Sequence, residues 1–441
     1  MSYRGLALGP LVAALVFAAA CGGDDKPTVK YPTGAGDDGG VATGTNVSTD
    51  TGAQVGVTDG PTAHTDLQGA AKDAYDRGFK AWMNGDLPGA KTAFKEATEK
   101  DSKAAPAFYS LGCVLERLGD NAGAQQAYRQ AYSAKSDYEL AMGGYALNLA
   151  RTGHGGEADT FLQDKKSKFP QSARIANYLA EVKSLAKDSA GAQQLAGEAL
   201  RIDPNFKDAM VTIARDHHRA GRAELASYAL RAILDGFGQG TPARDPDNAE
   251  AHLLRGLIER DAGLRIAALK DFEAARAKRP DLVEAAIQIG AMKLEAGNAQ
   301  EAQPILESAA RFAPQHPLAH LNLGDCYRLL TRYADAKKEL DTALSLDSTL
   351  SAAHYDMGLM YLFAPSFPGM SASDQVAAAL RELNTYRQMR GPKAPPGVSD
   401  DIDELITRAT QKQKDMNMAA APPASAAPAA SAAKADAGKP K

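Results

Sequence analysis

Residues 283–316 read VEAAIQIGAMKLEAGNAQEAQPILESAARFAPQH, and the pattern of small residues in this stretch recurs along the chain. Its glycine belongs to a ladder in which each glycine follows the previous one by 34 residues: Gly256, Gly290, Gly324 and Gly358. An alanine follows the first three of these glycines at one fixed distance: Ala268, Ala302 and Ala336. Self-similarity at a fixed period of this size indicates one structural unit copied in tandem.

Each unit is predicted to consist of two helices. Small and apolar residues recur with helical spacing in 286–290 and again in 302–309, and Gly297-Asn298 separates the two runs. A glycine inside a helix costs roughly 1 kcal/mol relative to alanine, so a ladder of glycines requires a packing reason. We expect the small residues to let two antiparallel helices approach closely. Pro314 then ends the second helix, because it has no amide hydrogen to donate.

This pattern resembles the tetratricopeptide repeat, a helix-turn-helix unit of 34 residues with small residues in the first helix and an alanine opening the second. The resemblance implies an all-α fold, a right-handed superhelix whose concave groove is lined by the first helices and binds a partner protein. Counting in steps of 34 residues, with one insertion, gives nine repeats: 71–104, 105–138, 139–172, 173–206, 207–248, 249–282, 283–316, 317–350 and 351–390. The superhelix as a whole is predicted to cover 67–390.

Two repeats contain insertions. The fifth carries extra residues around 236–240, and the ninth is interrupted at 364–369. Insertions in a repeat array project from one edge, where they either contact partners or are simply tolerated loops. A helix within 391–417 is predicted to cap the last repeat through one apolar stripe: Ile402, Leu405, Ile406 and Ala409. The Ala, Pro and Lys composition of 418–441 predicts a disordered tail.

The first residues have the composition of a lipoprotein signal peptide. In 1–20, Arg4 precedes an apolar run, and the run ends in small residues followed by Cys21. The resemblance to bacterial lipoprotein signals implies that Cys21 carries the lipid, which would anchor the protein to a membrane. Gly22 favours the outer membrane, on the side facing the periplasm. The alternative is an ordinary secretory signal.

The following segment, 21–66, contains almost no large apolar side chains. A segment of this composition does not bury a core, and we expect a disordered, flexible linker. A coil of about 45 residues has a root-mean-square reach of roughly 35–40 Å. The repeats are therefore predicted to be tethered to the membrane without being seated on it.

Nothing in the sequence predicts catalysis, and no cofactor, metal or small-molecule substrate is expected. Cys113 and Cys326 are predicted to be packed free thiols in distant repeats, because each repeat in such an array touches only its neighbours. Adjacent His217 and His218 diverge on a helix and are a poor metal site. The formal net charge of −4 and the pI of about 6.1 do not suggest a nucleic-acid surface.

Two groups of residues occupy first-helix positions that face the groove in the resembled family. The first group is aromatic and is predicted either to anchor a partner or to be buried between terminal repeats: Tyr75, Phe79, Trp82 and Tyr109. The second group is polar and is predicted either to hold an acidic peptide or to form a solvated face: Arg174, Asn177, Arg215 and Arg219. Both groups are candidates for partner binding.

A looser resemblance concerns the chain as a whole. The lipoprotein signal, the repeats, the end of the array at residues 354–390 and the Ala/Pro/Lys tail are similar to tetratricopeptide-repeat lipoproteins of the gliding motility machinery. This resemblance implies a non-catalytic periplasmic scaffold that binds envelope and motility-complex proteins. The alternatives are a pilotin-like assembly factor for an outer-membrane secretin or pilus pore, and an accessory subunit of polysaccharide export or cell-wall enzymes.

Overall fold

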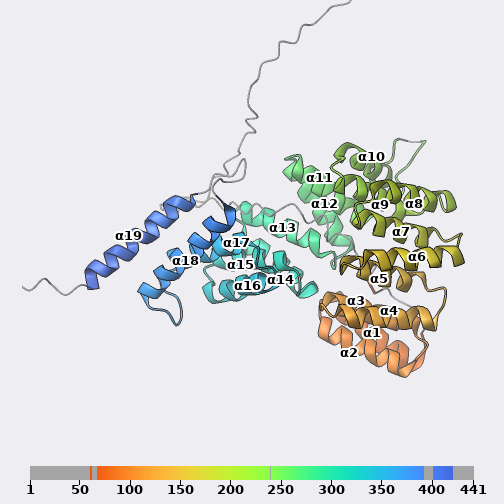
Figure 1. The fold of residues 1–441 in the computed structure, drawn as a ribbon, viewed down its shortest axis with the longest axis horizontal. Helices are drawn as coiled ribbons and strands as arrows, with labels where there is room; N and C mark the ends of the chain where they lie inside the picture. Colours follow the sequence, from red (N-terminus) through yellow and green to blue (C-terminus); the bar gives the residue numbers. More distant parts are fainter. Residues whose placement is uncertain (1–59, 62–66, 239, 392–400, 421–441) are drawn as a thin grey trace, which may run out of the picture.

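The computed structural model describes residues 60–61, 67–238, 240–391 and 401–420. Predictions about the signal peptide, Cys21, most of the linker and residues 421–441 lie outside these ranges. The described residues form nineteen α-helices, and their only β-type pairing is an isolated bridge between Gly236 and Pro242. Figure 1 shows the helices stacked in sequence order along a curved path. The predicted all-α repeat fold is therefore confirmed.

Eighteen of these helices form nine antiparallel pairs. The first helices of the pairs are α1 (Gly69–Met83), α3 (Ala105–Arg117), α5 (Glu139–Arg151), α7 (Ala173–Leu185), α9 (Lys207–Arg219), α11 (Ala249–Asp261), α13 (Val283–Glu295), α15 (Pro317–Leu329) and α17 (Ser351–Phe363). From the second pair onward, each of them begins at the first residue of the corresponding predicted repeat. The period of the sequence is thus the period of the structure.

The second helices lie antiparallel to the first. They are α2 (Leu87–Lys100), α4 (Asn121–Ala134), α6 (Gly155–Lys168), α8 (Ser189–Ile202), α10 (Ala223–Leu234), α12 (Arg265–Lys278), α14 (Ala299–Phe312), α16 (Tyr333–Leu346) and α18 (Ala372–Arg390). Asp side chains cap three of them by accepting hydrogen bonds from the Gly89, Gly123 and Gly191 amides at 2.9 Å.

The ladder glycines each make room for a large side chain from the second helix of their own repeat. A Cβ placed on Gly256 would lie 2.6 Å from Phe272, and the same addition at the other ladder glycines would also bring a carbon within 3.0 Å. The facing side chains are Phe272, Leu306, Leu340 and Leu383, and Gly78 and Gly112 of the first two repeats face Phe94 and Tyr128 in the same way. The helices pair closely, as predicted, but the glycine mainly accommodates this side chain, not the alanine that opens the second helix.

The turn between the two helices of a repeat uses a left-handed residue. Glycine supplies it in most repeats, as at Gly297 with φ 77°. Two repeats instead place Lys187 at φ 62° and Thr331 at φ 58°. A β-branched residue such as Thr331 is strained in this region of backbone space.

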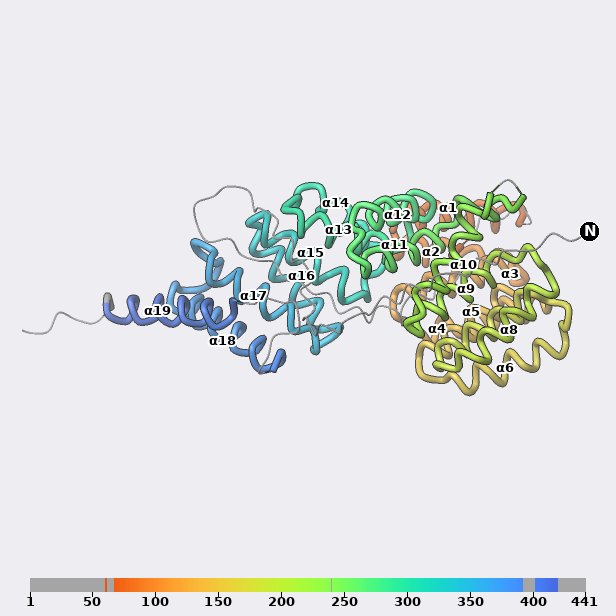
Figure 2. Tube along the Cα trace, turned by 90° about the horizontal axis from the view of Figure 1, so that it is seen from above, coloured from red at the N-terminus to blue at the C-terminus, as the bar shows by residue number. Residues whose placement is uncertain are grey.

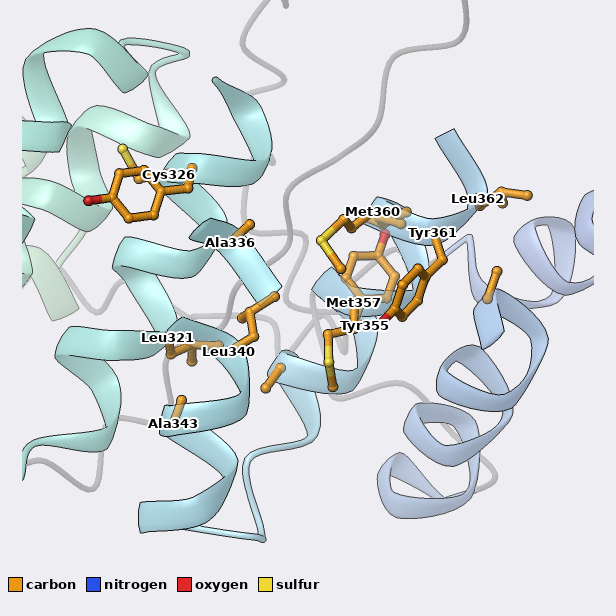
Figure 3. Close-up of a cluster of buried hydrophobic side chains, with 14 of the residues drawn as sticks. Leu321, Cys326, Ala336, Leu340, Ala343, Tyr355, Met357, Met360, Tyr361 and Leu362 are labelled. Atoms are coloured by element: carbon orange, nitrogen blue, oxygen red, sulfur yellow. The ribbon is translucent and has the colours of Figure 1, made fainter. Parts of the chain in front are cut away.

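The C-terminal repeats share one continuous core, part of which Figure 3 shows. Leu340 and Ala343 pack there with Met357 and Met360 from α17. The last helix, α19 (Ile402–Ala420), covers the end of this core with the predicted apolar stripe, and Ile402 and Ala409 are fully buried. Helix α19 ends at Ala420, slightly beyond the boundary predicted at 417.

The superhelix brings its first two repeats against its sixth and seventh. Arg117 of α3 donates a hydrogen bond through Nη2 to the backbone oxygen of Asp281 at 3.1 Å. A Cβ on Gly119, in the turn after α3, would lie 3.1 Å from the side chain of Gln315. Figure 1 accordingly draws α1–α4 next to α14, and Figure 2 shows the same superhelix turned by 90°. The expectation that each repeat touches only its neighbours is wrong here, because the stack curves back on itself.

Candidate partner-binding groove

The predicted aromatic anchors are mostly buried. Tyr75 is 0% exposed, its hydroxyl lies 2.9 Å from Ser110 Oγ, and its ring packs against Phe94. Tyr109 is also buried, against the rings of Tyr128 and Tyr138. These two tyrosines sit between helices and form the core of the first repeats. The interpretation of Tyr75 and Tyr109 as exposed anchors is therefore wrong.

Trp82 and Phe79 line a cavity of about 560 Å³ on the inner side of the superhelix. Its apolar wall also contains Met83, Leu140 and Pro280, so it joins the first, third and sixth repeats. Phe79 is half-buried, whereas Trp82 is buried at 2% exposure and Arg117 stacks over its ring at 5.7 Å. Trp82 is thus enclosed by the chain itself, which is the burial alternative of the prediction and not the exposed anchor.

The predicted arginine cluster is already neutralised by the protein. Arg215 is 3% exposed and lies between two carboxylates, 2.5 Å from Glu250 and 3.5 Å from Glu181. These carboxylates raise the pKa of Arg215, although burial opposes them as the largest single influence. A buried arginine with two carboxylate partners does not offer bidentate pairing to an acidic peptide. The role predicted for Arg215 is therefore wrong.

The other two arginines also have partners within the chain. Arg174 is half-buried, stacks over Phe206 at 5.5 Å and lies 3.4 Å from Asp208. Arg219 donates to Ser184 Oγ at 3.0 Å, and its burial lowers its pKa to about 10. The predicted group therefore forms part of a charge network inside the superhelix and not a set of free cations.

Asn177 keeps a role in the groove. It is 1% exposed, its Nδ2 lies 3.4 Å from Glu181 Oε1, and its Oδ1 has no hydrogen-bond partner. It lines a second cavity, of about 300 Å³, whose remaining wall is largely charged: Glu181, Asp208, Asp245, Asp247, Glu250, Lys278 and Arg279. Buried amide oxygens normally have a partner. Among the predicted polar residues, Asn177 Oδ1 and Arg215 Nε are buried without a hydrogen-bond partner.

Two recurring residue types have structural explanations. The histidines at one repeated first-helix position each contact a carboxylate of the second helix in the same repeat: His252–Asp271, His320–Glu339 and His354–Glu382. Cys113 and Cys326 are both buried, and burial raises the pKa of each thiol to about 12. Within the described ranges, no three metal-ligating side chains gather at one point.

A further surface was only partly foreseen from the sequence. Large apolar side chains are exposed on α10, on the insertion after it and at the start of α12: Leu225, Tyr228, Phe237, Leu264 and Ile266. Tyr228 packs on Phe237 with ring centroids 4.9 Å apart, and Ile266 is 90% exposed. The insertion around 236–240 was recognisable by its length. The neighbouring apolar side chains were not, because helical periodicity does not show which face of a second helix the next repeat covers.

The fold, the nine helix pairs and the inner cavities define the class of protein. Tetratricopeptide-repeat sequence profiles match residues 75–139 and 293–355. The chain thus carries tetratricopeptide repeats, and its described residues build a tetratricopeptide-repeat superhelix. This fold is generally a non-catalytic scaffold for protein–protein interaction. Comparison with curated protein sequences finds no significant match.

Solved structures with a similar fold include the Cut9 and Hcn1 hetero-tetramer of the APC/C, with a TM-score of 0.50 and 14% identity. That alignment covers 76% of this chain and 62% of the other, so this chain spans less than two thirds of its length. Pseudomonas aeruginosa PilF aligns with a TM-score of 0.32 and 21% identity, over 49% of this chain and 95% of PilF. At such identities the first likeness shows the fold alone, and the second is too weak to support more.

Proposed function

We propose that this protein is a non-catalytic scaffold that binds other envelope proteins through the inner face of its superhelix. The observation that carries the proposal is the pair of cavities on that face, lined by side chains of several repeats. Concave surfaces of stacked repeats are extended binding sites for partner proteins. The charged side chains of the second cavity, among them Asp245, Asp247 and Lys278, support this role, because they can pair with polar groups of a partner.

The proposed location follows from the sequence. Cys21 with its preceding signal would carry the lipid anchor, and residue Gly22 supports the outer membrane, with the repeats facing the periplasm. None of the helices within the described residues is long and apolar enough to cross a bilayer. In a test by membrane fractionation, Cys21→Ala should release the protein from the membrane. An unchanged membrane-bound fraction would contradict the lipid anchor.

Within this class, we propose membership of the gliding motility machinery, in a complex that spans the envelope. The support is the similarity of the chain's overall organisation to lipoproteins of that machinery. Deletion of the gene should abolish single-cell gliding. Loss of pilus multimers with gliding intact would instead identify a pilotin-like assembly factor.

Partner binding itself is tested by site-specific photo-crosslinking in the native envelope. The crosslinking residue replaces Asp247, which lines the charged cavity with a side chain 71% exposed. The matched control replaces Glu301 of α14, an acid of similar exposure, 64%, that lines neither cavity. We expect a defined envelope protein to be captured from position 247 and not from 301. Equal capture from both positions, or none from 247, would refute a partner site on the inner face.

A further inference from the structure

Two residues of the N-terminal segment lie inside the superhelix. Gly60 and Pro61 contribute to the wall of the cavity that Trp82 lines, and Pro61 is buried. Pro61 therefore lines the same cavity as Phe79 and Trp82, which the sequence predicts as candidate partner-binding residues. The prediction of a flexible linker throughout 21–66 does not hold at these two residues.

The contact is selective for a residue without a side chain. A Cβ on Gly60 would lie 3.2 Å from Trp82 Cζ2 and 3.2 Å from Asp281 Oδ2. Both distances are tighter than ordinary van der Waals contact, and the Arg117 guanidinium stacks over the indole, 5.7 Å from its centroid. A Cβ at this position would require the indole and the carboxylate to shift by a few tenths of an ångström, and a long side chain would require more. The site therefore accepts glycine followed by proline.

The walls of the cavity suit a proline. Phe79, Trp82 and Pro280 provide an apolar surface, and proline binds such aromatic-lined surfaces with little loss of conformational entropy. Arg279 pairs with Asp281 through two contacts, of 2.8 and 2.9 Å, which fixes the carboxylate beside Gly60. The surface is thus ordered before any partner arrives.

We propose that the surface of Phe79, Trp82 and Asp281 is a recognition site for extended Gly-Pro segments of a partner protein, and that the chain's own Gly60-Pro61 covers it in the resting state. The inference deepens the proposed scaffold function by naming the partner's chemistry and the way access is regulated. A segment attached to the same chain has an effective concentration on the order of millimolar, so a partner segment must compete with it. Release of the segment would open the site.

Trp82 is the only tryptophan of the chain, so its fluorescence reports on this site alone. The test uses the full chain purified in detergent, with the substitutions Gly60→Glu and, as a milder change, Pro61→Ala. Gly60→Glu introduces a bulky anion against Trp82 and Asp281 and should release the segment. Acrylamide quenching of Trp82 should increase about twofold. Gly197→Glu is the matched control, because a Cβ at Gly197 meets no atom within 4 Å.

A fluorescein-labelled peptide with the sequence of residues 54–66 tests the binding site directly. We expect it to bind the Gly60→Glu chain at least tenfold more tightly than the wild type or the Gly197→Glu chain. The same peptide carrying Glu in place of Gly60 should not bind. Equal peptide binding by wild-type and Gly60→Glu chains, or unchanged quenching in both Gly60→Glu and Pro61→Ala, would overturn the inference. These readouts need no partner, so they are separate from the crosslinking test of the scaffold function.

Discussion

The sharpest prediction concerns the fit between a ladder glycine and the side chain that it faces. In the sixth repeat, a Cβ added by Gly256→Ala would lie 2.6 Å from Phe272 Cε1 and 3.2 Å from the backbone oxygen of Ala268. Phe272 is fully buried, so it cannot turn out into solvent without leaving the core. Alanine improves helix propensity by about 0.5–1 kcal/mol, whereas overpacking costs about 1–3 kcal/mol. We expect a net loss of about 0.5–2 kcal/mol.

A double-mutant cycle tests this fit, and its second substitution is Phe272→Leu. Alone it removes part of a buried ring and should cost about 1–2 kcal/mol, less than the 3–5 kcal/mol of a phenylalanine-to-alanine change. Together with Gly256→Ala it recreates the pairing of the fifth repeat, where Ala214 shares a core cluster with Leu230. The double variant should therefore be more stable than the sum of the single effects, with a coupling of about 1–2 kcal/mol.

Hydrogen exchange of peptides from α11 and α12 is the appropriate assay, because a repeat array opens locally and one global midpoint does not describe it. The control is Gly197→Ala in α8, where the added Cβ meets nothing within 4 Å. This control should stabilise its helix by about 0.5–1 kcal/mol. If Gly256→Ala is as stabilising as Gly197→Ala, or if Phe272→Leu adds to its cost, steric exclusion does not explain the ladder.

Three further predictions follow from strain, charge and burial. Thr331→Gly should raise the free energy of unfolding by about 0.5–1 kcal/mol, because it relieves a left-handed threonine; a loss of stability in urea unfolding would contradict this. Burial and the neighbouring Asp325 raise the pKa of Asp356 far above its usual value. The native state thus holds this proton more tightly than the unfolded state, so stability declines as pH rises from about 4 through the folded pKa. Asp356→Asn should make the protein more stable at pH 7 and flatten this decline. An unchanged pH profile of stability would show that Asp356 does not cause the decline. Cys113 and Cys326, with pKa values raised to about 12, should resist alkylation at pH 8 in the native protein and react after denaturation; rapid labelling of the native protein would show that they are accessible.

The candidate site was harder to predict than the fold. Groove positions transferred from the resembled family named Trp82 and Asn177, and both line inner cavities. The same transfer presented Tyr75 and Arg215 as available to a partner, whereas the structure buries both. A position in a helix shows the direction in which its side chain leaves the backbone. It does not show that Ser110 or Glu250 of the next repeat will meet it there.

The sequence by itself determined the architecture of one repeat and the number of its copies. The residues that specify a helix pair lie within 34 positions of one another. Two side-chain positions that meet across the pair, such as Gly256 and Phe272, therefore belong to the same repeat and recur with its period. Only the tertiary structure decided how far the stack curves. Small rotations between repeats add up along the array until Arg117 reaches Asp281, which lies 164 residues away in the chain. That closure encloses Trp82 beside Gly60. The sequence of one repeat did not predict it, because the curvature depends on all the repeat interfaces together.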